Sequence, residues 1–148
     1  MTVFEAGLQL MSVFARFSWL APIASLMTNA SAKINIYFNQ PPLANDTSEL
    51  ADAWLDLMPP DGKEFFKIDR VEKDTAFVKI HLHCPLRDSG NATACYRLMN
   101  YDRKLMDEVG GQLVVLSSQS NSGNPFCELA IRPKNVDVSD LVPAHLQV

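Results

Sequence analysis

An acidic residue interrupts an apolar helical stripe near the middle of the chain. Residues 91–109 carry apolar side chains at the spacing of one helix face, and Asp102 falls at the centre of that face. The apolar positions are Cys95, Leu98, Met99, Leu105, Met106 and Val109. An inward carboxylate costs several kcal/mol unless it is paired, hydrogen-bonded or neutralised. We therefore interpret Asp102 as an acid–base or ligand-orienting group with a raised pKa. The alternatives are a salt bridge to Arg70, Arg87 or Arg132, or a position at the helix rim where the carboxylate reaches water.

Cysteine chemistry is the second possibility. Cys84 and Cys95 fall on apolar faces of predicted elements, and Cys95 lies in the first two turns of its helix, where a thiol pKa can be lowered. A nucleophilic cysteine also needs a base within hydrogen-bond reach, for which Asp102 or His83 are the candidates. Cys84, Cys95, Asp102 and His83 are thus the candidate catalytic residues of a hydrolase. The alternative for each thiol is packing alone.

Two closely spaced histidines raise the possibility of a metal site. His81 and His83 stand two residues apart in a predicted strand, so both imidazoles face one side. Two ligands do not make a site, no third stands at short spacing, and Cys84 faces the opposite way. Exposed histidines on the wet face of a sheet are the simpler interpretation. The sequence predicts no metal site and no cofactor, since it carries no Gly-rich phosphate loop, serine elbow, zincin motif or CxxC.

Composition limits the function classes. A length of 148 residues indicates one domain, and a net charge of −4 argues against a nucleic-acid surface. The three cysteines, Cys84, Cys95 and Cys127, are an odd number and so exclude a complete internal disulfide framework. Their apolar settings favour reduced thiols in a cytoplasmic protein.

The N-terminal segment is unusually apolar. Between positions 6 and 27 the only charged residue is Arg16. We interpret this segment as a helix buried against the domain or against a second copy in a homodimer. A secretory signal ending near positions 30–32, or a membrane anchor, is the alternative; Glu5 argues against the signal, while Arg16 and Pro22 near the middle argue against a span.

The remaining pattern predicts an α+β domain. The expected elements are a helix over 2–27 broken near Pro22, a strand over 34–38, a helix over 48–57, strands over 65–72 and 75–84, a helix over 91–109, and strands over 112–119 and 126–132. This order gives an antiparallel sheet built from two hairpins that flank a central helix, with the N-terminal helices packed on it. We expect one domain over 1–148, with a helical region at 1–62, a hairpin–helix–hairpin core at 63–133 and a loosely held tail at 134–148.

Part of the core resembles a known family. The run from Ala94-Cys95-Tyr96 to Gly110-Gly111, the strand after it, and Gly123-Asn124-Pro125-Phe126-Cys127 resemble 4-vinyl reductase-like domains over about residues 66–133. These domains share the fold of small-molecule-binding domains of nitric-oxide signalling and Golgi transport proteins. Zinc-binding members carry a cysteine where this chain has Gln119, so the resemblance does not extend to a zinc site.

A second resemblance concerns Cys84-Pro85 and the cysteine-bearing helix that follows. This arrangement is similar to 2-amino-thiazoline-4-carboxylate hydrolase-like proteins, which implies a catalytic cysteine.

The sequence predicts a domain that binds a small apolar molecule between the helix over 91–109 and the sheet, in a sensory or accessory role. The expected ligand-binding residues are Cys95, Tyr96, Met99, Asp102, Arg103 and Met106. A cysteine-dependent hydrolase and a structural or interaction subunit are the alternatives, so whether the protein is an enzyme stays open.

Overall fold

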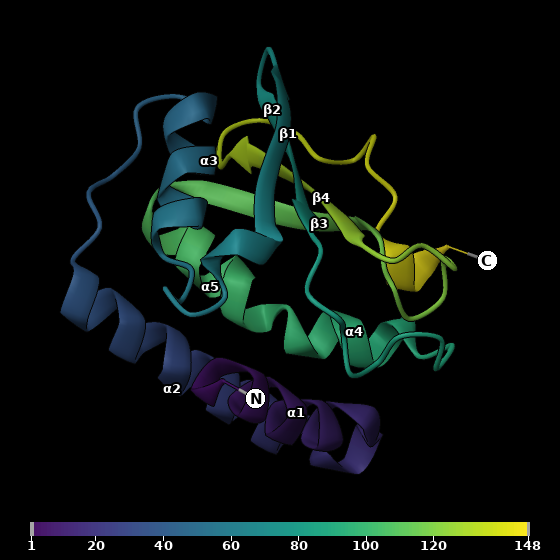
Figure 1. Ribbon diagram of the computed structural model, residues 1–148. Coiled ribbons are helices and arrows are strands. Elements are labelled where there is room, and N and C mark those ends of the chain that lie inside the picture. Colours follow the sequence, from purple (N-terminus) through teal and green to yellow (C-terminus); the bar gives the residue numbers. More distant parts are fainter. Residues whose placement is uncertain (1, 148) are drawn as a thin grey trace.

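The computed structural model describes residues 2–147, so Met1 and Val148 lie outside the description, and its architecture is α+β (Figure 1). The helices are α1 (Val3–Arg16), α2 (Ala21–Asn39), α3 (Thr47–Asp56), α4 (Ala92–Leu98) and α5 (Asn100–Glu108), with short 3₁₀ turns η1 (Ser18–Leu20), η2 (Lys63–Phe65) and η3 (Ala144–Leu146). The strands are β1 (Phe66–Glu72), β2 (Thr75–Ile80), β3 (Gly111–Ser117) and β4 (Cys127–Pro133).

The four strands form one antiparallel sheet in the order β1-β2-β4-β3. Each hairpin pairs its own strands, and β2 joins β4 in the middle, with Val78 opposite Leu129. The strand period of two places Val78, Leu129 and Ile131 on the face that packs against helices, where all three are fully buried. The predicted fold class, with two hairpins around a central helix, is therefore confirmed.

The helices lie in two layers on this sheet. α3 packs on β1, β2 and β4, and α5 packs on β3. α1 and α2 then pack on α4 and α5, which separate them from the sheet (Figure 1). Of the N-terminal helices, α3 packs on three strands as the sequence predicted, whereas α1 touches the sheet at the start of β1, where Phe4 meets Phe66.

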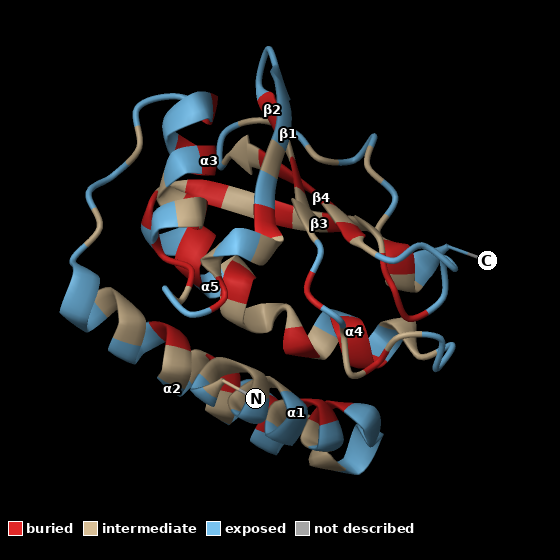
Figure 2. Cartoon of the chain, viewed as in Figure 1, coloured by how far each residue is buried: buried red, intermediate tan, exposed pale blue. Residues whose placement is uncertain are grey.

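Burial follows these layers and divides the interior into two apolar clusters. The larger cluster fills the space between the sheet, α3 and α5 around Trp54 and Leu105. The smaller one lies between α1, α2 and α4 around Leu86 and Leu98. Met99, at the junction of α4 and α5, packs against both. Figure 2 shows the buried residues concentrated in β2–β4 and in α3–α5, while β1, α1 and α2 are largely intermediate or exposed.

The N-terminal segment departs from the prediction in two places. The helix expected over 2–27 ends at Arg16, and α2 restarts at Ala21 with Pro22 in its first turn, where a missing N–H is harmless. The strand expected over 34–38 is wrong, because α2 continues to Asn39. Its helical spacing points Ala32 and Ile36 into the larger cluster, so an alternating apolar pattern is satisfied by a helix.

Two elements near the site also differ from expectation. The helix predicted over 91–109 is divided at Met99, next to which the Asn100 amide donates to Thr28 Oγ1 at 2.9 Å and anchors the junction to α2. The strand predicted to reach Cys84 ends at Ile80, after which the chain turns away from the sheet. The apolar stripe nevertheless stays inward on both α4 and α5, because the division shifts the helix axis without reversing its face.

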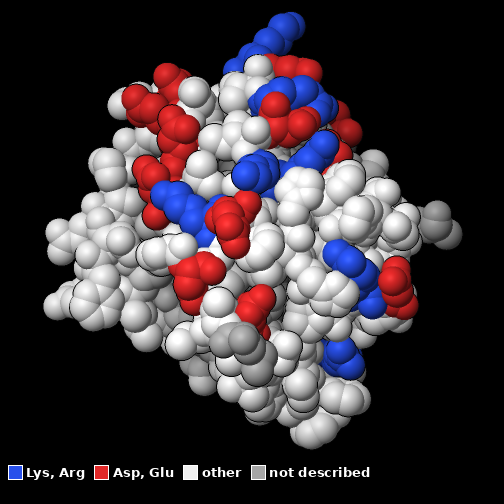
Figure 3. Space-filling view, viewed as in Figure 1, with Lys and Arg blue, Asp and Glu red and all other residues white. Residues whose placement is uncertain are grey.

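The outer face of α1 and α2 carries large apolar side chains. Trp19, Leu26, Tyr37 and Phe38 are each more than two thirds exposed, and Leu10 of α1 is more than half exposed. In Figure 3 charged side chains gather over the β1–β2 hairpin and α3, whereas the part formed by α1 is mostly uncharged. Within residues 2–147 no single helix has the length and apolar character of a membrane span; α1 and the Ser18–Asn39 segment reach it only together, bent by 114°. The homodimer through this region stays a prediction.

The C-terminal segment, for which the sequence predicts loose attachment, makes several contacts. Lys134 pairs with Asp107 at 2.7 Å, and Arg132 pairs with Asp140 at 2.6 Å. The Gln147 amide donates to the carbonyl oxygen of Leu116 at 2.8 Å. These contacts hold the segment against α5 and β3.

Substitution of Gly111 tests how closely α3 approaches the start of β3. A Cβ at Gly111 would lie 2.8 Å from Leu50 Cδ2, and Leu50 is buried in the larger cluster. We expect Gly111→Ala to lower the free energy of unfolding by about 1–3 kcal/mol, because the packed core must shift.

The measurement is the urea midpoint of each variant. Gly7→Ala is the matched control, since a Cβ at Gly7 in α1 meets nothing within 4 Å and alanine favours helix. Equal midpoints for the two variants would contradict the close approach of Leu50.

Candidate functional site

A cavity of about 240 Å³ lies where the two apolar clusters meet. Its walls come from α1, the start of β1, the end of β2, the α4–α5 junction and the segments around Gln119 and Cys127. The lining is predominantly apolar and consists of Val3, Phe4, Gly7, Leu8, Met11, Ser31, Met58, Phe66, Ile80, Leu82, Cys84, Cys95, Leu98, Met99, Tyr101, Asp102, Gln119 and Cys127. The cavity arises because α1 covers the seam between the clusters without filling it.

Asp102 is the carboxylate in this lining. Its residue is 8% exposed, and its Oδ1 accepts a hydrogen bond of 3.0 Å from Trp54 Nε1. Among residues 2–147 its side chain has no salt bridge, so the predicted pairing with Arg70, Arg87 or Arg132 does not occur. Burial raises the pKa of the Asp102 carboxyl to about 6, while the Trp54 hydrogen bond and the charge of Arg103 act in the opposite direction.

Trp54 is the hydrogen-bond partner of Asp102, and the sequence did not predict this contact. It is fully buried on α3, and its ring meets Phe66 edge-on at a centroid distance of 5.5 Å. A buried indole needs an acceptor for its N–H, and a buried carboxylate needs a donor. Both needs were visible in the sequence, but only the packing of α3 across α5 joins them.

Gln119 is a buried polar side chain in the same lining. Its Oε1 accepts from Arg87 Nε at 2.7 Å and from the backbone N–H of Cys84 at 3.2 Å, and its Nε2 donates to the carbonyl oxygen of Leu82 at 2.8 Å. This fully buried amide therefore ties the segment after β2 to the end of β3. Among residues 2–147 no group of three or more His, Cys, Asp or Glu side chains is arranged to hold a metal ion.

All three cysteines line the cavity, and all are free thiols. Burial raises the pKa of the Cys95 thiol to about 11 and that of Cys127 to about 12. Burial also raises the pKa of Cys84, but the backbone N–H of Leu86, 3.4 Å from the sulfur, and the nearby charge of Arg87 act against this rise. The thiols are thus held in the protonated form at neutral pH.

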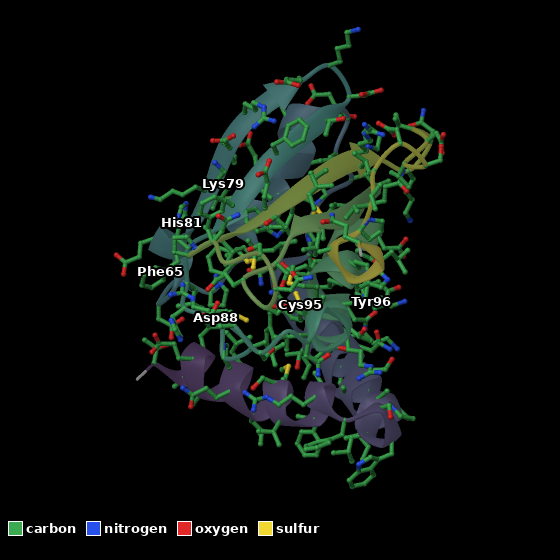
Figure 4. All side chains as sticks on the ribbon, turned by 90° about the vertical axis from the view of Figure 1, so that its right-hand side faces the viewer. Phe65, Lys79, His81, Asp88, Cys95 and Tyr96 are labelled. Atoms are coloured by element: carbon green, nitrogen blue, oxygen red, sulfur yellow. The ribbon has the colours of Figure 1, made fainter. Side chains whose placement is uncertain are left out.

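The structure brings Cys84, Cys95, Met99 and Asp102 of the predicted site residues to one cavity, and it places the others elsewhere. Met106 is fully buried in the larger cluster and does not reach the lining. His83 is exposed, as is His81, which lies at the outer edge in Figure 4.

Tyr96 and Arg103 lie on the other side of the α4–α5 unit. The Tyr96 ring stacks on His145 at a centroid distance of 4.0 Å, and the Arg103 guanidinium lies 4.0 Å from the Tyr96 centroid. Both residues line a second cavity beneath the C-terminal segment. They miss the first cavity because the helix face that carries Asp102 points the opposite way; in Figure 4 Cys95 lies inside and Tyr96 to its outer side.

Comparison of the chain with family models, with curated proteins and with solved structures gives no match. The resemblances to 4-vinyl reductase-like domains and to the thiazoline carboxylate hydrolases stay predictions.

The raised pKa of Asp102 predicts a pH-dependent stability difference. Because the folded-state pKa of about 6 lies above the ordinary value of 3.8, the proton stabilises the fold fully below about pH 4, and this contribution is lost as the pH rises through 6. Asp102→Asn keeps an acceptor for Trp54 and does not titrate. Relative to this variant, the wild type should lose up to about 3 kcal/mol between pH 4 and pH 7.

Urea unfolding of both proteins across this pH range measures the difference, in which the other carboxylates cancel. Parallel stability curves would mean that Asp102 titrates as an exposed carboxyl.

The cysteine environments predict an order of alkylation. At neutral pH we expect all three thiols of the folded protein to react with iodoacetamide more slowly than an unfolded control. Cys84 should react first, because it is the least buried and faces the Leu86 N–H. Mass spectrometry of timed samples gives the order, and fast labelling of Cys95 or Cys127 would contradict the buried arrangement.

Proposed function

We propose that this protein binds a small, largely apolar molecule in the cavity between α1 and the α4–α5 junction. The observation that carries the proposal is the partly enclosed, apolar cavity into which a single carboxylate, Asp102, projects. Ligand sites are typically concave and apolar with a few convergent polar groups. An apolar cavity of roughly 150 Å³ accepts benzene, so about 240 Å³ leaves room for a substituted ring or a short branched chain. A sensory or accessory role, which the sequence predicts, is part of this proposal.

The resemblance to small-molecule-binding 4-vinyl reductase-like domains points to the same function. It covers the segment that supplies Cys95, Met99, Asp102, Gln119 and Cys127 to the cavity. A role as a purely structural subunit has less support, because such a subunit would need no cavity next to a buried carboxylate.

A cysteine-dependent hydrolase is the second candidate, favoured by the position of Cys84 and Cys95 in the cavity wall. Two observations weigh against it. The described lining holds no histidine, and His83 is exposed. Burial also raises the pKa of the thiols, whereas a nucleophilic cysteine needs a lowered one.

Filling the cavity tests the proposal. Gly7 lines it from α1, and a Cβ there meets no atom within 4 Å, so Gly7→Leu places a side chain in the open space. We expect wild-type protein to bind toluene with a Kd of roughly 1 mM or below, and Gly7→Leu to weaken binding at least tenfold. NMR titration of backbone amides gives both the affinity and the site.

The matched control is Ala6→Leu, which adds the same side chain one position earlier on α1, at an exposed residue outside the lining. It should bind toluene as the wild type does. Wild-type protein that shows no amide shifts at the cavity would contradict the proposed function.

A further inference from the structure

Among the described residues, the lining of the cavity contains an acid, Asp102, that forms no ion pair. Asp102 is more than nine-tenths buried, and its one side-chain hydrogen bond within residues 2–147 comes from the neutral indole of Trp54. The described lining includes no lysine, arginine or histidine. Buried carboxylates in proteins are normally paired with a cation.

The nearest basic residue in sequence, Arg103, lowers the pKa of Asp102 through its charge but forms no ion pair with the carboxylate. The Arg103 side chain donates from a terminal nitrogen to the carbonyl oxygen of Tyr96 at 2.7 Å, and its guanidinium lies over the Tyr96 ring. These two contacts hold it in the second cavity, on the far side of the helix. Trp54 donates to Oδ1 of Asp102, whereas Oδ2 has no side-chain donor among the described residues and remains available to a ligand.

Aromatic rings stand in the same lining. Phe4 and Phe66 meet at a centroid distance of 6.1 Å, and Tyr101 precedes Asp102 on α5. The faces of such rings attract cations, and this attraction strengthens when water is excluded. A carboxylate together with aromatic rings is the combination that recognises an organic ammonium group.

From this arrangement we infer that the ligand of the cavity is an apolar amine, whose ammonium group pairs with Asp102 while its hydrocarbon part fills the space lined by α1. The inference rests on the proposed function and names the ligand class. Forming a buried ion pair usually requires both ions to lose water. Here burial has already removed most of the solvent exposure of the carboxylate, so the additional desolvation on binding falls mainly on the ammonium group.

The test compares three probes of one shape: benzylamine, benzyl alcohol and toluene. We expect wild-type protein at neutral pH to bind benzylamine at least tenfold more tightly than benzyl alcohol, because a charge-assisted hydrogen bond replaces a neutral one. Asp102→Asn should bring this ratio to within about threefold of one, while Asp107→Asn, an exposed acid on the same helix, should keep the wild-type ratio. Phe4→Leu, which removes a ring but keeps apolar bulk, should lower the ratio about threefold or more.

The outcomes separate the two proposals. If toluene binds at the cavity but benzylamine binds no more tightly than benzyl alcohol, the amine inference is overturned and the proposed function stands. If none of the probes shifts the amides of the lining, the proposed function itself fails. An amine preference that survives in Asp102→Asn would also overturn the inference, because the carboxylate would not be its source.

Discussion

The hydrogen bond between Trp54 and Asp102 links the two parts of the interior on which this fold is built. Trp54 belongs to the larger apolar cluster beneath α3, and Asp102 projects at the seam between that cluster and the smaller one. Without the indole N–H, the buried carboxylate would lose its side-chain donor, and an incompletely paired buried carboxylate costs several kcal/mol. Without the carboxylate, the indole N–H would lose its acceptor. Each group therefore makes the burial of the other tolerable.

This seam also explains why a cavity exists in a protein of this size. Interiors are normally close-packed, with few voids larger than a water molecule. Here α1 and α2 rest on α4 and α5 instead of on the sheet, so α1 spans the step between the two clusters. Gly7 presents no side chain to that step, and the space beneath it stays open. The cavity is a consequence of the layering, and its chemistry is set by the few polar groups at its ends.

Gln119 holds the segment after β2 in place. Its amide bridges the segment after β2 to the end of β3, and so fixes the backbone that carries Cys84. The two segments are thus connected by a neutral amide whose hydrogen bonds are satisfied. The three cysteines remain free, protonated thiols in the apolar lining.

Much of the fold was predictable because local patterns and tertiary packing agree. The hairpins, the helix that became α3 and the inward face of the central helix all follow from periodicity and turn residues. The strand expected over 34–38 was wrong because its alternation is equally satisfied by a helix that buries Ala32 and Ile36. Periodicity over five residues cannot distinguish the two, and the continuity of α2 decided the matter.

By itself the sequence determined that Asp102 turns inward, because its place in a 3.6-residue apolar stripe allows no other face to be buried. It likewise placed Cys95 on the apolar face of its helix, whereas Cys84 reaches the cavity from the segment after β2 and not from a strand face. Only the tertiary structure decided what meets there, since the partners come from distant segments: Trp54 from α3, Gln119 from the end of β3 and Gly7 from α1. The tertiary structure also places Tyr96 and Arg103 at a second cavity and Met106 in the core, because the α4–α5 unit borders three different environments. Periodicity gives the direction of a side chain, whereas its surroundings depend on how separate elements pack.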